Sequence, residues 1–514
     1  MSAAVLLSSS FPTWRAADSA DVQVDWQAQG NWLKHTWEGL GNVDQMRWML
    51  RRDMQEQLQM AQRELNLRHV RAVGMFDDEL RIIGTDPTRF FSENRKEKRI
   101  NWQILDYILD SLLDIGINPM VTTCFTPTEL ASGSATTFTT RSNITPPKDY
   151  IAWEGLVKNC ISHYDDRYGR ERLKNWYYEV WNEPNLTGFW TGGMEEYYKL
   201  YKITYDAIKS FDPAFRVGGP STARAEYIGE FLEFATKNDC MPDYIIGHCY
   251  NNDSANAPLS PFEGPQADRE NKSPNFTAGV VRGVMKILDE FNYQGEVHWN
   301  EWGLSWHPYA PVRETANEAA FIVKTMHEVS QLGDYFAYWC LSDIYDQVGY
   351  NREAFAGHYG MISVYGLRKP NYFAHQLLTR MGDVQVPVNS KHQSCQGFAS
   401  KTTNGYQLML YAFDINYTAK DKAQSQDVTF ELPEDWNQQI RLYKIDCKEN
   451  NILYHWQQMG APAYLKPEEI KDLQAINQLK ESTDQVQVEQ QGNKKTGRIK
   501  MSHPGVAMLL MGKR

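Results

Sequence analysis

The sequence has few cysteines, no long apolar run and no excess of basic residues. Its seven cysteines, among 514 residues, are odd in number and lack the CxxC spacing of a metal site. They therefore predict free thiols in a reducing compartment, not a disulfide framework. The longest apolar run near the C-terminus covers residues 506–511, which is far too short to cross a bilayer.

The net charge and the amino end exclude further classes. A formal net charge of −11 argues against a nucleic-acid backbone or an anionic membrane as a partner. Residues 1–10 lack the basic region and the full-length apolar core of a secretory signal peptide. We therefore expect a cytoplasmic protein, with a processed periplasmic form as the alternative. The sequence leaves a homo-oligomer open.

Aromatic residues, by contrast, are plentiful. They make up 13% of the chain and include 16 tryptophans, while hydrophobic residues as a whole make up 42%. A chain of this length has room for one domain of barrel size and a second, smaller domain. Core packing accounts for most single tryptophans, but a surplus of aromatic side chains also suits ligands with apolar ring faces, such as sugars.

Strand-like and helix-like segments alternate along the first three quarters of the chain. The first strand is expected at residues 31–36. A helix at 43–65 follows, because apolar residues from Met46 to Ala61 recur there at steps of three and four. The pattern predicts an α/β fold, a (β/α)8 TIM barrel over residues 31–381. A doubly wound sheet is the structural alternative, but no strand-to-helix turn carries a glycine-rich phosphate loop.

After residue 381 the pattern changes to alternating apolar and polar residues, which is typical of half-buried antiparallel strands. The expected elements are strands at 406–413, 427–432, 439–445 and 506–511 and a helix at 467–479. We therefore predict a C-terminal β-sandwich over residues 382–514. A strand from the N-terminal segment, residues 1–30, is expected to join it.

One stretch, NWYYEVWNEPN at residues 175–185, has the composition of a buried aromatic strand that stops abruptly. Pro184 cannot donate a ladder hydrogen bond, so the strand is expected to end there with Glu183 at its carboxyl tip. In a barrel, that end of the strands forms the active site. A lone Glu before proline is usually a helix cap or an ion pair. The aromatic residues Phe189 and Trp190 just beyond it favour a carboxylate in an aromatic cleft.

A second carboxylate, Glu301, lies at the tip of the seventh predicted strand, in VHWNEWG. Gly303 beyond it permits a sharp turn. The tips of strands four and seven face each other across a closed eight-stranded barrel. Two facing carboxylates can cleave a glycosidic bond when one is protonated and the other charged, and their mutual repulsion separates their pKa values. Asn182, beside Glu183, is expected to hold a ring hydroxyl.

Further motifs narrow the choice of family. They are TPPKDY at 145–150, HCY at 248–250, YW at 338–339 with SD at 342–343, KP at 369–370, and HWQQMG at 455–460 followed by PEE at 467–469. Together with WNEPN and the second Glu, they resemble glycoside hydrolase family 39, whose members include β-xylosidases and α-L-iduronidases. The catalytic motifs are shared by many families, whereas the HWQQMG string is specific. The resemblance runs from about residue 37 to the C-terminus.

The resemblance implies a retaining, exo-acting, β-xylosidase-like glycosidase that uses neither a cofactor nor a metal. Its substrate would be an oligosaccharide or glycoside. It implies that Glu183 is the acid/base and Glu301 the nucleophile. The residues expected to contact the sugar are Asn182, His248, Tyr250, Trp339, Phe189, Trp190 and Asp346. Without the resemblance, a core histidine and barrel packing would explain His248 and Trp339 equally well.

The sequence departs from the β-xylosidases of the family at two positions. It has Val73 where they have a histidine, and Asp346 with Gln347 where they have paired acidic residues. Both positions would touch sugar hydroxyls, so the chemistry is expected to be shared while the sugar differs. Nearby, Asp77 and Asp78 are expected to form a solvated loop pair.

Several alternatives follow from these departures. A galactoside, glucoside, arabinoside or uronide could replace the xyloside, and loops 131–147 and 251–275 could form an open groove for endo action. A non-catalytic carbohydrate-binding barrel is an alternative from another class. A metal-dependent hydrolase fits worst, because no cluster of His and Asp has the spacing of metal ligands.

Overall fold

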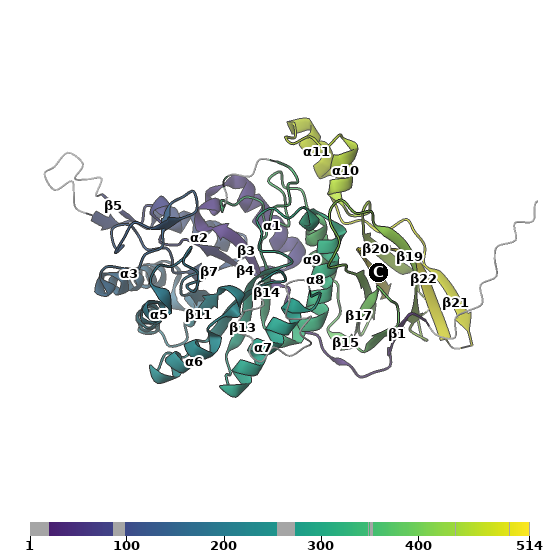
Figure 1. The fold of residues 1–514 in the computed structure, drawn as a ribbon, viewed down its shortest axis with the longest axis horizontal. Helices are drawn as coiled ribbons and strands as arrows, with labels where there is room; N and C mark the ends of the chain where they lie inside the picture. Colours follow the sequence, from purple (N-terminus) through teal and green to yellow (C-terminus); the bar gives the residue numbers. More distant parts are fainter. Residues whose placement is uncertain are drawn as a thin grey trace, which may run out of the picture.

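A closed barrel and a β-sandwich lie side by side (Figure 1). The computed structural model describes residues 20–85, 98–253, 273–347, 349, 353–436, 438–492 and 494–512. Among these residues, no helix has both the length and the apolar composition needed to cross a membrane.

Eight strands, each paired in parallel with its neighbour, form the barrel. They are β3 (Gly39–Gln45), β4 (Leu67–Val73), β7 (Asn118–Thr122), β10 (Tyr177–Glu179), β11 (Arg216–Thr222), β12 (Tyr244–Tyr250), β13 (Glu296–Gly303) and β14 (Tyr335–Tyr338). Backbone hydrogen bonds close the barrel, because β14 bonds to the residue segment before β3 and β3 to the segment after β14: Phe336 N donates to Thr36 O and Leu341 N to Asn42 O, both at 2.8 Å. The predicted (β/α)8 barrel is therefore confirmed.

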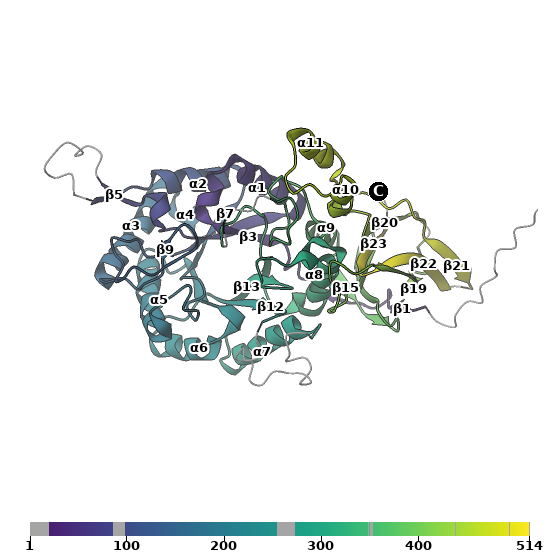
Figure 2. The same ribbon diagram turned by 45° about the horizontal axis from the view of Figure 1, so that its top comes forward.

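Helices surround the strands (Figure 2). They are α1 (Arg52–Leu65), α2 (Gln103–Asp114), α3 (Tyr150–Tyr168), α4 (Arg170–Leu173), α5 (Gly193–Lys209), α6 (Ile228–Lys237), α7 (Phe276–Glu290), α8 (Ala316–Val329) and α9 (Pro370–Leu378). α1 buries Met54, Leu58 and Ala61, as the apolar spacing predicts, but the helix predicted over 43–65 starts too early, because residues 43–45 belong to β3 and Met46–Leu50 form a 3-10 helix. Asp149 caps α3 by accepting a 2.9 Å hydrogen bond from Ile151 N.

The sandwich consists of two sheets. One contains β16 (Val388–Ser390), β1 (Val22–Val24), β19 (Gln424–Leu432), β22 (Lys494–His503) and β21 (Gln487–Gln491). The other contains β2 (Asn31–Trp32), β15 (Val384–Val386), β17 (Gln396–Thr402), β18 (Gly405–Ala412), β23 (Gly505–Gly512) and β20 (Ile440–Ile445). Apolar side chains of both sheets, such as Phe430 and Leu509, share one buried cluster. The predicted C-terminal β-sandwich is therefore confirmed.

α8 connects the two units. Most of its side chains are buried, because one face packs on the barrel and the other on the sandwich strands β18 and β23. Asn317 Nδ2 donates to Asp414 O at 2.9 Å, and His327 Nδ1 lies 2.8 Å from the Tyr411 hydroxyl. α10 (Ile452–Gln458) and α11 (Pro467–Ile476) form a further apolar cluster with Phe355 and Leu367.

Three strand predictions need correction. Residues 31–36 do not form the first barrel strand: β2 at Asn31–Trp32 pairs with β15 in the sandwich, and β3 is the first barrel strand. The fourth strand ends at Glu179, before Glu183, and the fifth strand, expected at residues 216–219 before Pro220, continues to Thr222. The domain boundaries at residues 30 and 381 stay predictions.

Candidate active site

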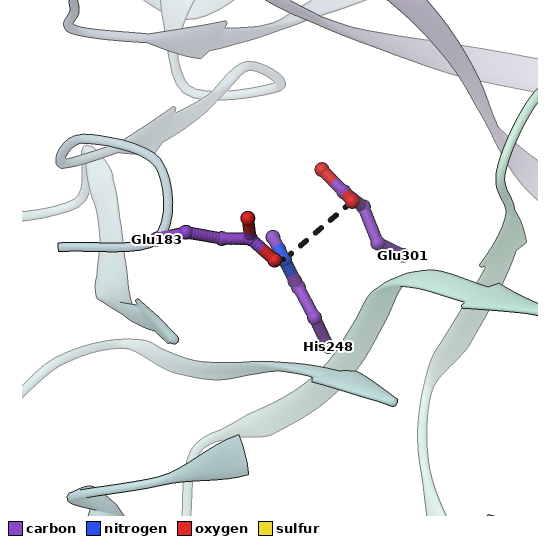
Figure 3. Close-up of side chains that lie close together, drawn as sticks. All are labelled: Glu183, His248 and Glu301. Atoms are coloured by element: carbon purple, nitrogen blue, oxygen red, sulfur yellow. Dashed lines mark hydrogen bonds and ion pairs between the residues drawn. The ribbon is translucent and has the colours of Figure 1, made fainter. Parts of the chain in front are cut away.

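Three side chains from separate parts of the chain meet at the carboxyl ends of the barrel strands (Figure 3). Glu183 follows β10, His248 lies on β12 and Glu301 lies on β13. One carboxylate oxygen or ring nitrogen of each residue lies within 4.8 Å of the others. His248 Nδ1 is 2.9 Å from Glu183 Oε1 and 3.6 Å from Glu301 Oε2. The two carboxyl groups therefore lie on either side of a fully buried histidine.

A strained turn presents Glu183. Trp181 (φ 67°) and Glu183 (φ 47°) both adopt left-handed backbone conformations, which are uncommon for residues other than glycine. Glu183 N donates to Ser221 O at 2.9 Å. The Trp181 ring is fully buried 4.6 Å from the ring of Trp190, and its Nε1 donates to Phe189 O. Aromatic packing therefore holds the turn in place.

A bulge in β13 presents Glu301. Gly247 pairs with Trp299 while His248 pairs with Glu301, so β13 has an extra residue, Asn300, relative to β12. The two consecutive side chains both face the barrel interior: Asn300 Nδ2 donates to Glu179 Oε1 at 3.0 Å, and Glu301 reaches Arg71. A regular strand would have turned one of them outward.

Both oxygens of Glu301 accept hydrogen bonds from protein donors. Arg71 Nη1 donates to Oε1 at 2.8 Å, and the Tyr250 hydroxyl donates to Oε2 at 3.0 Å. Burial raises the pKa of Glu301 above its ordinary value, while the charge and hydrogen bond of Arg71 oppose the rise. Because a charged donor and a hydroxyl satisfy its lone pairs, the ionised form of Glu301 is well supported.

The carboxyl group of Glu183 has a different environment. The described residues give it one hydrogen bond, to His248 Nδ1, and no ion pair with Lys or Arg. Burial raises the pKa of Glu183 to about 7, which the more distant charges of Arg71 and Arg224 only partly oppose. Glu183 is therefore the carboxyl group of the pair that is suited to carry a proton near neutral pH.

Below these groups lies a third carboxylate, Glu179, which the sequence analysis missed. It is fully buried and accepts from Arg71 Nε at 2.7 Å and Nη2 at 3.0 Å. The hydroxyls of Thr122 and Ser221 donate to it as well. Burial alone would raise the pKa of Glu179, but the charge and hydrogen bonds of Arg71, with those of the two hydroxyls, hold it below its ordinary value. Glu179 and Arg71 are therefore a buried, fully hydrogen-bonded ion pair.

Four of the predicted sugar contacts lie close to the carboxylates. Asn182 Oδ1 accepts a hydrogen bond from Arg71. His248 lies beside both carboxyl groups, and Tyr250 donates to Glu301. Trp339 packs in a buried aromatic cluster with Tyr250 and Tyr359. Tyr359, which the sequence analysis also missed, lies 6.3 Å from the Trp339 ring, centroid to centroid.

The other predicted contacts lie elsewhere. Trp190 packs behind Trp181, and Phe189 packs on Phe138 at 5.7 Å. Asp346 is fully buried beyond β14, where its backbone N donates to Asp44 Oδ2 at 3.0 Å. In the described structure, none of these three forms a hydrogen bond or ion pair with Glu183 or Glu301. Their contacts with a sugar stay predictions.

The expectation of a solvated Asp77–Asp78 pair is half wrong. Asp78 is exposed and accepts from Thr128, but Asp77 is buried and accepts from the Ser142 hydroxyl and from Glu79 N. Burial raises the pKa of Asp77 to about 6. Val73, at the end of β4, is buried and offers no polar atom from its side chain.

The proximity of Glu183, His248 and Glu301 also allows a metal ion to be considered. The Arg71 guanidinium already lies 2.8 Å from Glu301 Oε1, so a divalent cation would be placed beside a buried positive charge. Binding would also require ionisation of Glu183, which burial disfavours. The arrangement is better suited to proton transfer between a carboxyl group and a ligand than to metal coordination.

Comparisons with known proteins show which family and which relatives this chain is similar to. The family model described as "Glycosyl hydrolases family 39" matches residues 20–495. A beta-xylosidase of Caldicellulosiruptor saccharolyticus is 32% identical over 434 residues, covering 84% of this chain and 86% of that protein. A beta-xylosidase of Geobacillus stearothermophilus is 30% identical over 355 residues, covering 68% and 69%.

A solved structure has the same fold. The crystal structure of a monomeric beta-xylosidase from Caulobacter crescentus CB15 superposes with a TM-score of 0.82 and 24% identity. The match covers 96% of this chain and 100% of that chain. At this identity the likeness supports the fold, while the family follows from the model match and the two relatives in sequence.

Proposed function

Because the chain belongs to the glycosyl hydrolases of family 39, we propose that Glu301 is its nucleophile, Glu183 its acid/base and a β-xyloside its substrate. The observation that carries the proposal is the unequal environment of two carboxyl groups with oxygens within 4.8 Å of each other. Retaining glycosidases hold the pair roughly 5–5.5 Å apart, whereas inverting ones need roughly 6.5–9.5 Å to admit a water.

The reaction proceeds in two displacements. Glu301 attacks the anomeric carbon, the bond to the leaving oxygen breaks, and that oxygen takes the proton of Glu183. In the second step a water gives its proton to the Glu183 carboxylate and attacks the anomeric carbon, which releases Glu301. The net reaction consumes one water and yields the free sugar and an alcohol. Tyr250 and Arg71 hold Glu301 in place for the attack.

Exo action is supported by the hairpin of β8 (Thr136–Thr137) and β9 (Ser142–Asn143). Its Thr139 hydroxyl donates to Asp346 and its Ser142 hydroxyl to Asp77, so it is tied to the loops after β14 and β4. A hairpin tied in this way blocks one side of the barrel mouth and favours a blind-ended pocket. The other loop considered for endo action, 251–275, lies mostly outside the described residues.

Two features support the choice of sugar and of compartment. Both curated relatives reported above are named beta-xylosidases, but Val73 brings no hydrogen bond to the sugar, so other glycosides stay in the test. All seven cysteines are free thiols and six of them are buried, which favours a reducing compartment such as the cytoplasm.

A panel of aryl glycosides tests the proposal: β-xyloside, galactoside, glucoside, arabinoside and iduronide, with the first-formed anomer read by NMR. We expect turnover of the xyloside with retention of configuration. Inversion would contradict the assigned roles. Turnover of a different sugar with retention would keep the mechanism and replace the substrate. Failure on every glycoside and oligosaccharide would favour a carbohydrate-binding barrel.

A further inference from the structure

A chain of hydrogen bonds runs from Glu183 down into the barrel. Glu183 Oε1 lies 2.9 Å from His248 Nδ1, and His248 Nε2 lies 3.2 Å from the Ser221 hydroxyl. Ser221 in turn bonds to Glu179 Oε1. His248, Ser221 and Glu179 are fully buried, and they come from β12, β11 and β10. The chain therefore joins three adjacent strands.

The ion pair at the bottom of this chain fixes the direction of its hydrogen bonds. Glu179 is ionised beside Arg71, so it can only accept, and the single proton of the Ser221 hydroxyl is committed to it. Toward His248, Ser221 can then only accept, which requires a proton on Nε2. Glu179 also accepts a hydrogen bond from the amide nitrogen of Asn300 at 3.0 Å, which further supports its ionised form.

The state of His248 then determines the state of Glu183. Burial lowers the pKa of His248, so the ring is neutral and carries one proton. With that proton on Nε2, Nδ1 presents a lone pair to Glu183 Oε1 at 2.9 Å. A carboxylate would be repelled there, whereas a protonated carboxyl group donates a hydrogen bond.

We propose that Ser221 and Glu179 are positioning residues that hold His248 in its Nε2–H tautomer and thereby keep the proton on Glu183. This inference rests on the proposed role of Glu183 as the acid/base. In the first step, Glu183 gives its proton to the leaving oxygen. In the second step, the bare Nδ1 beside the Glu183 carboxylate makes that carboxylate a stronger base toward water.

Other groups act on Glu183 through space and are the same in the variants compared below. They are Arg71 on β4, Arg224 after β11, Tyr250 on β12, Asp253 beyond it, Glu301 on β13 and Tyr359 after β14. Of these, Arg71 and Arg224 favour ionisation of Glu183. Burial and the carboxylates of Glu179, Glu301 and Asp253 favour its protonated form, and the hydrogen bond to His248 acts in the same direction.

The matched variants are Ser221→Ala and Thr122→Val. Each removes one hydroxyl that donates to Glu179, but only Ser221 also contacts His248. The measurement is kcat/KM against pH, because its alkaline limb reports the acid in the free enzyme. We expect Ser221→Ala to move that limb to lower pH by about one unit, the size of one lost hydrogen bond. The ring is then free to take the Nδ1–H form, which stabilises ionised Glu183.

The control and the choice of leaving group separate this effect from general damage. Thr122→Val is expected to keep the alkaline limb where it is in the wild type. Ser221→Ala should lose about tenfold on a substrate with a poor leaving group and little on an activated aryl glycoside, which departs without protonation. An equal shift in both variants, or no shift in Ser221→Ala, would overturn the proposal.

A spectroscopic measurement on the wild-type protein covers the case in which Ser221→Ala does not fold. With nitrogen-15-labelled histidine, the ring signals of His248 are identified by their loss in His248→Gln. The proposal requires a protonated Nε2 and an unprotonated Nδ1. The reverse pattern would overturn it whether or not a glycoside is turned over, so its failure is distinguishable from failure of the proposed function.

Discussion

The two ends of the barrel interior are built from the same strands but from different chemistry. At the amino end, five aromatic rings form a closed circle with neighbouring centroids between 4.6 and 6.3 Å apart. They are His69, Tyr177, Tyr244, His298 and Tyr335. At the carboxyl end, β4 continues from His69 to Arg71, and β10 from Tyr177 to Glu179. A step of two residues along each of these two strands exchanges an aromatic ring for a charge.

The comparison separates what stabilises the barrel from what the reaction needs. The aromatic circle is neutral, since burial lowers the pKa values of both its histidines. The carboxyl end instead buries Arg71 with two carboxylates, although burial of charges costs free energy unless every one is paired. The reaction requires these charges, which explains why they are kept in a part of the barrel that is as buried as the aromatic circle.

The largest expected difference between the two ends is in stability. Arg71→Met would leave Glu179 and Glu301 buried without their cation, and we expect a loss of about 3–5 kcal/mol in the free energy of unfolding. Tyr244→Phe at the amino end removes a buried hydroxyl that forms no hydrogen bond with any of the described residues, so we expect a change of less than about 1 kcal/mol. Denaturant unfolding measures both. Similar losses in the two variants would break the comparison.

The pH dependence should follow the carboxyl end. Activity needs a protonated Glu183, whose pKa burial raises to about 7, so kcat/KM should fall as pH rises through that value. Stability changes with the same sign. A carboxyl group whose pKa is raised by folding binds more protons in the folded state, so its contribution falls as pH rises between the unfolded and folded pKa values. Glu183→Gln should remove the alkaline limb; a limb that survives the substitution would belong to another group.

A smaller effect is expected from single hydroxyls at the two ends. Tyr250→Phe removes the donor to Glu301 Oε2, and a hydrogen bond of about 0.5–1.5 kcal/mol corresponds to roughly a tenfold loss in kcat/KM. Tyr244→Phe should leave kcat/KM at the wild-type value. Steady-state kinetics on one aryl glycoside compares them, and equal losses would show that the aromatic circle also supports catalysis.

The sequence could predict the two carboxylates because local signals mark both strand ends. Pro184 directly follows Glu183, Gly303 ends β13, and aromatic residues flank both Glu residues, although β10 itself ends earlier, at Glu179. The helices that carry apolar faces were predictable for the same local reason, as α1 illustrates.

The buried charges were not predictable in this way. Every residue of β10 is buried, so no alternation of polar and apolar residues tells which side chains face the interior. Ser221 lies beyond the predicted end of the fifth strand, and the role of Asn300 depends on a bulge that only pairing with β12 reveals. The role of Arg71 can be inferred only when the register of the strands shows that its side chain reaches Glu301.

Azide rescue of two alanine variants tests the central claim, the division of roles between Glu183 and Glu301, most directly. The substrate is an aryl β-glycoside with an acidic phenol as leaving group. In Glu183→Ala, Glu301 still forms the covalent intermediate, and azide, which needs no base, should release a β-azide. In Glu301→Ala, azide attacks from the vacated face and should give the α-azide. The same anomer from both variants, or normal activity of Glu183→Ala toward poor leaving groups, would contradict the account.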